Sequence, residues 1–335
     1  MFRTAIVGCG GIAQVHKKVL MSMPGVALVA CCDIKPQKAE DFARGTTINW
    51  YSNLDEMLEC EALDCVHICT PHPLHTPIAI KCAEHGLHVF TEKPPVVSYE
   101  QWEEFYKLKE AKSYVGICFQ NRYNYSVLKA REFMANGSMG GVKGARAFLT
   151  WNRTEEYYTE SGWRGSWTTE GGGCLINQAI HTLDLLVYLL GKPEDVECHM
   201  TNHSLKKVIE VEDTFEAYIR FKNDVAAVFF ATNAYCDNSP VFIEIICEKG
   251  KLRLEGNDLT VIYADGSKEE FSDNMVPQFE KNYWGNSHFE CIKDFYRCVS
   301  SKKPYKNEID SVRSTMELML EMYKPFTGKN LGEEK

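Results

Sequence analysis

A glycine-rich turn near the start of the chain constrains the fold more than any other feature. The run Gly8-Cys9-Gly10-Gly11-Ile12-Ala13 follows a short apolar segment, 4–7, and opens a stretch with apolar residues at helical spacing, 12–23. In such a turn the first glycine permits a tight bend, the second lets a pyrophosphate approach the backbone, and the small last residue lets helix and strand pack closely. The pattern predicts a strand-turn-helix unit that binds a dinucleotide, with Gly8, Gly10, Gly11 and Ile12 at the cofactor.

Asp33 supports this prediction and bears on the choice of cofactor. It ends the next apolar run, 26–32, where a carboxylate can accept hydrogen bonds from an adenosine ribose. A carboxylate there favours NAD, because it would repel the 2′-phosphate of NADP. Lys35 and Lys38 follow closely, and either could pair with that phosphate, so NADP stays an alternative.

The first 120 residues alternate short apolar runs with helical stretches. Apolar runs are found at 4–7, 26–32, 64–70, 88–91 and 114–119, and helical spacing at 12–23, 75–85 and 99–112. Short, fully apolar strands separated by helices indicate a parallel sheet covered on both faces. We therefore predict a Rossmann-type α/β domain, a doubly wound parallel sheet over residues 1–120.

Beyond residue 120 the pattern changes to segments in which apolar and polar residues alternate. Strands are expected at 142–152, 214–222, 225–233, 241–248, 251–255 and 259–264, and helices at 124–136, 171–190, 286–300 and 308–323. Tight turns between successive strands favour a mostly antiparallel sheet in an α+β domain over residues 121–335, with its C-terminal helix able to pack back on the first domain. Helices would cover one face of this sheet, so we expect oligomerisation through the other face.

Composition limits the classes of partner and indicates the cellular compartment. The formal net charge is −9 and the basic residues are scattered, which argues against nucleic acid as a partner. No apolar run approaches the roughly 18 residues that a membrane span needs, and Met1-Phe2-Arg3 leads straight into a strand without a signal peptide, so we expect a cytoplasmic protein. The fourteen cysteines form no CxxC pair and most lie in apolar runs, so we interpret them as buried free thiols and expect no metal site.

A second motif, Thr91-Glu92-Lys93-Pro94-Pro95, follows a strand and so lies at the carboxyl edge of the sheet, where ligands bind in open α/β folds. The two prolines restrict where Lys93 can point. A lysine beside a cofactor cation is a plausible acid/base or hydrogen-bond donor for a hydroxyl under oxidation. The alternative from these residues alone is a solvated surface lysine.

A third motif runs from Gly171-Gly172-Gly173 to Asp184. The glycines allow close approach of a ligand before a helix begins, and spacing places Asn177, His181 and Asp184 on one helical face. Such a polar face suits hydroxyl recognition, and a histidine has the intrinsic pKa for proton transfer. The alternative is a core histidine satisfied by Asp184. The preceding segment 153–170, rich in Tyr and Trp, either lines the substrate pocket or packs in the core.

Together these motifs resemble the Gfo/Idh/MocA oxidoreductases, the group of glucose–fructose oxidoreductase and inositol dehydrogenase. The resemblance covers essentially the whole chain and includes Thr70-Pro71-His72-Pro73-Leu74-His75, Glu92-Lys93-Pro94, and Trp163-Arg164-Gly165 leading to Asp184. It implies a Rossmann domain followed by a domain built on a large open sheet, in homodimers or homotetramers. It also implies hydride transfer between a nicotinamide and a hydroxyl carbon of a sugar, inositol or sugar derivative.

By position, the resemblance implies that Lys93 and His181 are the catalytic pair, with Lys93 also contacting the nicotinamide ribose. The cofactor-lining positions that it implies are Thr70, Pro71, His72, His75, Glu92 and Asn121. The substrate-binding positions are Arg122, Tyr123, Trp163, Arg164, Asn177 and Asp184.

Two departures from the family pattern matter. The family often has Asp where this chain has Asn177, and an amide cannot serve as a base, so proton transfer would fall to His181 and Lys93. Position 72 is often Asn in the family and is His here. Two other functions remain open: a redox-neutral glycosidase that holds NAD⁺ tightly, and a non-catalytic regulator that senses a sugar or nucleotide. Retention of Lys93 and His181 argues against the regulator.

Overall fold

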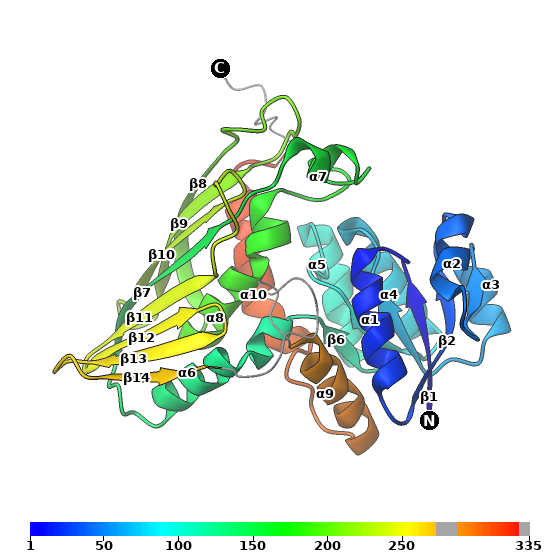
Figure 1. The fold of residues 1–335 in the computed structure, drawn as a ribbon, viewed down its shortest axis with the longest axis horizontal. Coiled ribbons are helices and arrows are strands. Elements are labelled where there is room, and N and C mark those ends of the chain that lie inside the picture. The colour runs from blue at the N-terminus through cyan, green and yellow to red at the C-terminus, as the bar shows by residue number, and fades with distance from the viewer. Residues whose placement is uncertain (273–286, 328–335) are drawn as a thin grey trace. The chain divides into compact units, whose positions relative to one another are not determined.

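The computed structural model describes residues 1–272 and 287–327, which form two compact units (Figure 1). The first unit comprises Met1–Phe119 and His288–Val312, and the second comprises Gln120–Ser287 and Arg313–Lys335. The chain thus leaves the first unit near residue 120 and returns to it for about two dozen residues late in the sequence. The first of these crossings lies between Phe119 and Gln120.

Six parallel strands form the sheet of the first unit, in the order β3-β2-β1-β4-β5-β6. They are β1 (Phe2–Val7), β2 (Val26–Cys32), β3 (Asn49–Tyr51), β4 (Cys65–Ile68), β5 (His88–Thr91) and β6 (Val115–Ile117). The strand order reverses direction between β1 and β4, and right-handed crossovers then place the helices after β1 and β4 on opposite faces. The predicted doubly wound parallel sheet is confirmed.

Five helices connect the successive strands of this unit, and one more comes from the segment 288–312. They are α1 (Gly11–Ser22), α2 (Pro36–Ala43), α3 (Leu54–Cys60), α4 (His75–Glu84), α5 (Tyr99–Tyr106) and α9 (His288–Ser301), with 3₁₀ turns at His72–Leu74 and Lys107–Glu110. The predicted helix 286–300 corresponds to α9, although its first residue lies outside the described part of the chain. The sequence did not predict α2, β3 and α3, which bury few side chains.

The late segment completes the core of the first unit. The ring of Phe295 packs edge-on against that of Phe90, with centroids 5.2 Å apart, and lies so close to Gly116 that a Cβ there would be 2.7 Å from it. Asn307 extends the pairing at β6, since its carbonyl accepts the Ile117 N–H and its amide donates to the Phe119 carbonyl, each at 3.0 Å.

Eight strands form the sheet of the second unit, in the order β14-β13-β12-β11-β7-β10-β9-β8 (Figure 1). They are β7 (Val142–Thr150), β8 (Pro193–Thr201), β9 (Thr214–Phe221), β10 (Ala226–Thr232), β11 (Phe242–Cys247), β12 (Gly250–Glu255), β13 (Asp258–Tyr263) and β14 (Lys268–Phe271). Only β7 and β10 pair in parallel, so the prediction of a large, mostly antiparallel sheet is confirmed. The two edge strands β8 and β14 were not predicted.

Helices cover one face of this sheet. They are α6 (Tyr125–Ala135), α7 (Glu155–Thr159), α8 (Ile180–Leu190) and α10 (Ile309–Tyr323), with a 3₁₀ turn at Gln120–Tyr123 and a π-helical turn at Leu175–Ala179 leading into α8. α8 contacts β7, and α6 contacts β12 and β13 (Figure 1). Strand register places Tyr218, Val228 and Ile246 together on the opposite face, where each side chain is about half exposed.

The cysteines lie where the sequence suggested. All fourteen are free thiols, and all but Cys60, Cys198 and Cys236 are buried. In the described part of the chain, none of the helices combines the length and the apolar character that crossing a membrane requires.

Candidate active site

The glycine turn after β1 has the shape that a pyrophosphate needs. Gly8 has φ = 91°, and a Cβ there would be 2.7 Å from the carbonyl atoms of Cys69, so only glycine fits. Gly10 is the N-cap of α1 and offers no side chain to cap the first N–H groups of the helix. A Cβ at Gly10 or Gly11 would meet nothing within 4 Å among the described residues. An uncapped helix N-terminus behind an open glycine cradle suits phosphate oxygens.

Two polar groups border this cradle. Asp33 is held there because its Oδ2 accepts the Cys9 N–H and its Oδ1 accepts the Lys35 N–H, both at 2.9 Å. Thr70 follows β4, and its Oγ1 is buried without a hydrogen-bond partner in residues 1–272 and 287–327. A buried hydroxyl without a partner is costly, so a bound polar group at this edge would stabilise it. The residues therefore fit a dinucleotide, and contact of Asp33 with its ribose stays a prediction.

We expect Asp33→Asn to weaken NAD binding by roughly 10-fold and to raise the relative affinity for NADP. The substitution removes one charge-assisted hydrogen bond to the ribose and the repulsion of a 2′-phosphate. Calorimetric titration with NADH and NADPH measures both effects. Asp55→Asn, on the exposed surface of α3, is the matched control. An unchanged ratio of the two affinities would exclude Asp33 from cofactor selection.

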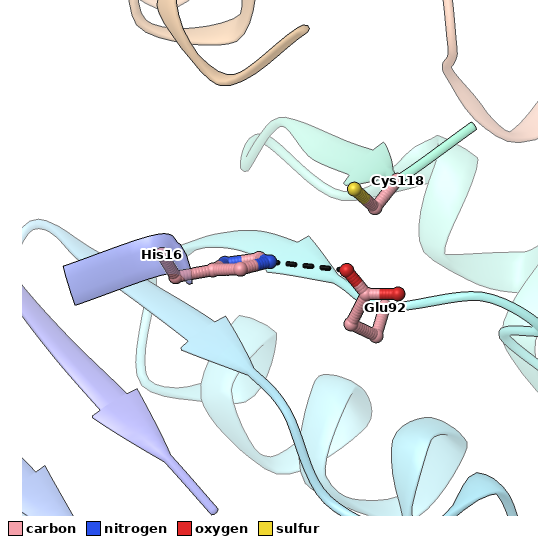
Figure 2. Close-up of side chains that lie close together, drawn as sticks. All are labelled: His16, Glu92 and Cys118. Atoms are coloured by element: carbon pink, nitrogen blue, oxygen red, sulfur yellow. Dashed lines mark hydrogen bonds and ion pairs between the residues drawn. The ribbon is translucent and has the colours of Figure 1, made fainter. Parts of the chain in front are cut away.

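Glu92, at the carboxyl end of β5, lies in a buried polar cluster (Figure 2). Its Oε1 is 3.0 Å from His16 Nε2, and its Oε2 accepts the Lys93 backbone N–H at 3.2 Å. Burial by itself would raise the pKa of Glu92, but the hydrogen bond with His16 lowers it well below its usual range. Glu92 is therefore a carboxylate directly beside Lys93.

The same cluster contains the one candidate cation-binding group found in the described chain. Polar atoms of His16, Glu92 and Cys118 lie within 4.8 Å of one another (Figure 2). However, both ring nitrogens of His16 already take part in hydrogen bonds, so the arrangement is complete without a cation.

The hydrogen bonds continue from His16 deeper into the first unit. His16 Nδ1 lies 2.8 Å from His67 Nδ1, His67 Nε2 lies 2.9 Å from the Tyr296 hydroxyl, and that hydroxyl lies 2.9 Å from Thr4 Oγ1. Burial lowers the pKa of His67 well below its usual value, so this ring is neutral. The sequence analysis did not predict this series of hydrogen bonds. The signal was His67 inside the apolar run Val66-His67-Ile68, because a buried histidine needs a hydrogen-bond partner.

The motif 70–75 holds two loops together. His75 is fully buried, with Nδ1 2.6 Å from the Pro94 carbonyl and Nε2 2.8 Å from the Thr70 carbonyl. Pro71 caps the 3₁₀ turn that contains His72, whose side chain is also buried. His75 thus ties the segment after β4 to the segment after β5, and its contact with a cofactor stays a prediction.

In the second unit, a buried carboxylate braces the three-glycine turn. Glu212 Oε2 accepts the Gly173 N–H at 2.9 Å, and Oε1 accepts the Leu175 N–H at 2.9 Å and the Tyr323 hydroxyl at 2.7 Å. Burial raises the pKa of Glu212 to about 7 although these donors oppose the shift. The chain therefore enters the π-helical turn Leu175–Ala179 from a fixed start, and π turns often occur at functional sites.

Asn177 lies in that π turn and His181 in the first turn of α8. Asn177 Nδ2 donates to Glu170 Oε1, and His181 Nε2 is 3.5 Å from Gln120 Nε2. Both side chains are half-buried. Sequence reasoning anticipated Asn177 and His181 but not Glu170 or Gln120, which reach them from other segments.

Asp184 does not share this environment. It is 1% exposed, and its carboxylate receives Arg122 Nε at 2.7 Å and Nη2 at 2.5 Å, together with Thr315 Oγ1 at 2.8 Å. Arg122 is equally buried, and its guanidinium lies 4.6 Å from the Tyr188 ring centre. The alternative in which Asp184 satisfies His181 is thus not what the structure shows, because both oxygens of the Asp184 carboxylate accept hydrogen bonds from Arg122. Direct contact of these two side chains with a substrate stays a prediction.

The remaining predicted residues flank this helix start. Arg164 is half-buried, with its guanidinium 4.3 Å from the Tyr157 ring centre and 4.7 Å from that of Trp163, and its Nε lacks a partner in the described residues. Asn121 is buried and its Oδ1 likewise lacks a described partner, while the neighbouring Tyr123 is half-buried. Segment 153–170 therefore brings aromatic and cationic groups together, as a polar ligand site requires.

Two models of one protein family match the chain. The first, described as an oxidoreductase family with an NAD-binding Rossmann fold, matches residues 2–119. The second, the GFO/IDH/MocA C-terminal domain, matches residues 127–253. Together they cover most of both units.

Named relatives are dehydrogenases. The chain is 26% identical to scyllo-inositol 2-dehydrogenase (NAD(+)) of Bacillus subtilis, over 97% of this chain and 98% of that protein. It is 31% identical to D-glucoside 3-dehydrogenase of Escherichia coli, over 62% of this chain and 58% of that protein. The crystal structure of the WlbA dehydrogenase from Bordetella pertussis, in complex with NADH and UDP-GlcNAcA, superposes with a TM-score of 0.84 at 27% identity, covering 96% of this chain and 95% of that one.

Proposed function

Because the chain belongs to the GFO/IDH/MocA family of NAD-dependent oxidoreductases, we propose that it oxidises a hydroxyl carbon of a sugar, inositol or sugar derivative. The observation that supports the proposal is the pair of polar, half-buried side chains at one helix start, Asn177 and His181, behind a glycine turn braced by Glu212. When bound, NAD supplies the hydride acceptor.

The chain's own residues would handle the proton. Lys93 or His181 takes the hydroxyl proton as general base, since both are groups whose pKa an active site can bring near neutrality. Asn177 orients a hydroxyl without accepting its proton, because an amide is not a base. Arg164, Trp163 and Tyr123 bind neighbouring hydroxyls, and the ion pair of Arg122 with Asp184 supports the segment that carries Asn121 and Tyr123.

The substrate class follows from what the relatives have in common. An inositol, a glucoside and a nucleotide-linked sugar acid all present a secondary hydroxyl flanked by further polar groups. The test is NADH formation at 340 nm with NAD⁺ and a panel of inositols, glucosides, free sugars and nucleotide sugars. Turnover of one compound would support the proposal and narrow the class. Absence of NADH formation with every compound, in protein that binds NADH, would contradict the proposal. Release of phenol from aryl glycosides without net NADH formation would indicate the redox-neutral glycosidase.

We also propose that two copies of the chain associate through the uncovered face of the eight-stranded sheet. Tyr218, Val228 and Ile246 lie on that face and are 46%, 49% and 45% exposed. Phe148, Phe230 and Phe242 share it in register. Glu197 and Glu216 lie beside Tyr218 and Phe230 in register, so the face is mixed, and its exposed apolar side chains are stabilised when a second copy covers them.

We expect Val228→Glu to lower the apparent mass from that of an oligomer to that of a monomer, because it would bury a carboxylate at the centre of the face. Sedimentation velocity measures the change. Leu128→Glu, which alters an equally exposed apolar residue on α6, is the control and should leave the assembly intact. A monomeric parent protein, or an unchanged mass in the Val228 variant, would contradict the proposed interface.

The free thiols support a reducing setting. Fourteen cysteines without a disulfide are typical of proteins in the cytosol, where thiols stay reduced. We therefore propose that the enzyme works in the cytoplasm.

A further inference from the structure

We propose that Glu170 is a positioning residue that decides which atom of Asn177 faces the substrate. The inference rests on the proposed function, since it assumes that Asn177 contacts a substrate hydroxyl. It assigns a role to a buried acid that connects three motifs: Trp163-Arg164-Gly165, the three-glycine turn, and Asn177.

The geometry around Glu170 is that of a carboxylate fixed from two sides. The residue is 1% exposed and directly precedes the glycine turn. Its Oε2 accepts the Gly165 backbone N–H at 2.6 Å, and its Oε1 accepts a hydrogen bond from Asn177 Nδ2 at 2.5 Å. An ionised carboxyl group only accepts hydrogen bonds. Glu170 can therefore bind the amide nitrogen of Asn177 but not its oxygen.

This restriction sets the orientation of the amide. The two ends of an asparagine amide point in different directions, so fixing Nδ2 on Glu170 turns Oδ1 away from it. Asn177 then presents an acceptor oxygen, to which a substrate hydroxyl can donate. Asn177 would thereby align a hydroxyl as a carboxylate at that position would, although it cannot take the proton.

Protonation of Glu170 would reverse this orientation of the Asn177 amide. Burial raises the pKa of Glu170 to about 7, against the lowering effects of the Gly165 N–H, Asn177 and Arg164. The charge of Glu212 also raises the pKa of Glu170, and the charge of Glu170 in turn helps to raise the pKa values of the neighbouring Tyr157, Tyr158 and Cys174. A proton on Oε1 would make Glu170 a donor, and Asn177 would have to turn Oδ1 toward it. The folded pKa is raised, so the orienting carboxylate is present above about pH 7 and lost below it.

Glu170→Gln tests the orientation directly. Glutamine has one acceptor oxygen, and the Gly165 N–H, fixed in the backbone, needs it. The glutamine amide then donates to Asn177 Oδ1. It holds this oxygen toward position 170, and so away from the substrate, at every pH. We expect kcat/KM to fall by roughly 10- to 100-fold, as for loss of one oriented group in an active site. The fall of kcat/KM below about pH 7 that is due to Glu170 should disappear.

The double variant Glu170→Gln/Asn177→Asp distinguishes positioning from a merely structural role. A carboxylate at position 177 accepts the glutamine's hydrogen bond with one oxygen and presents the other to the substrate, so we expect kcat/KM to recover to within a few-fold of the parent. Asn177→Asp alone places two carboxylates in contact and should not improve activity. A double variant no better than Glu170→Gln would overturn the proposal.

A second measurement needs no substrate. The side-chain amide signal of Asn177, in protein labelled with ¹⁵N-asparagine, is identified by its absence from Asn177→Asp. We expect it to titrate with a midpoint near pH 7 in the parent protein and not in Glu170→Gln. If the signal titrates but no polyol is oxidised, the proposed function fails while the orientation by Glu170 stands. If a substrate is oxidised but the Asn177 amide signal changes neither with pH nor in Glu170→Gln, the positioning role of Glu170 fails.

Discussion

Lys93→Met is expected to lower kcat by about 10²–10⁴-fold while the protein still binds the dinucleotide. Methionine keeps an unbranched side chain only one atom shorter than that of lysine, but it carries no group that can donate or accept a proton at the hydroxyl. Lys93 follows β5 and the buried carboxylate of Glu92, whereas the pyrophosphate is expected at the cradle formed by Gly10 and Gly11. The substitution should therefore lower kcat without a matching loss of dinucleotide binding. Steady-state rates at 340 nm and a fluorescence titration with NADH measure the two effects.

Lys107→Met provides the matched control, because Lys107 lies exposed in the 3₁₀ turn Lys107–Glu110. It should have parental kcat and parental NADH affinity. A kcat within a few-fold of the parent for Lys93→Met would remove Lys93 from proton transfer and leave His181 to act alone. Equal loss of kcat and of NADH binding would instead make Lys93 chiefly a cofactor ligand.

Gly173→Ala is expected to destabilise the second unit by roughly 4 kcal/mol or more, enough to prevent its folding at 37 °C. A Cβ at this position would be 2.0 Å from the Glu212 carbonyl oxygen and 3.0 Å from its carbonyl carbon. The backbone cannot move aside cheaply. The Gly173 N–H is bound to the Glu212 carboxylate, and the Cys174 N–H donates to that same carbonyl oxygen at 3.1 Å.

Urea unfolding followed by tryptophan fluorescence measures the effect. The control is Gly141→Ala, in the same unit, where the nearest neighbour of a new Cβ is the flexible Glu248 side chain at 3.4 Å. It should shift the unfolding midpoint little. A Gly173 variant with parental stability and parental activity would show that the turn can open away from Glu212, and that this close contact does not restrain the helix start carrying Asn177.

Much of the fold could be predicted because buried strands and amphipathic helices leave periodic patterns. The parallel strands around Gly8 and the alternating strands β9 to β13 were expected within a few residues of their observed ends. The edge strands β8 and β14 were missed for the opposite reason. Most of their side chains are exposed or half-buried, so the alternation that marks a half-buried strand is weak.

The candidate site was predictable only where its residues are close in sequence. Asn177 and His181 were found from a motif, but the expected face including Asp184 assumed regular helical spacing and no competing partner. The turn Leu175–Ala179 is π-helical, and Arg122, 62 residues earlier, takes the Asp184 carboxylate. Glu212 reaches the glycine turn from 39 residues away, and no local pattern indicates such a contact.

The return of the chain to the first unit has a consequence for how the protein is made. Thr4 in β1 is paired with Tyr296, and Gly116 in β6 is covered by Phe295, yet these partners are synthesised almost three hundred and one hundred and eighty residues later. A nascent chain of 120 residues would hold the whole parallel sheet while one buried side of it still lacks its cover. The cofactor-binding unit therefore has to wait for the ribosome to pass residue 312, after most of the second unit, residues 120–287, has been synthesised. The first unit cannot finish folding from the N-terminus onward before that long insertion has been made.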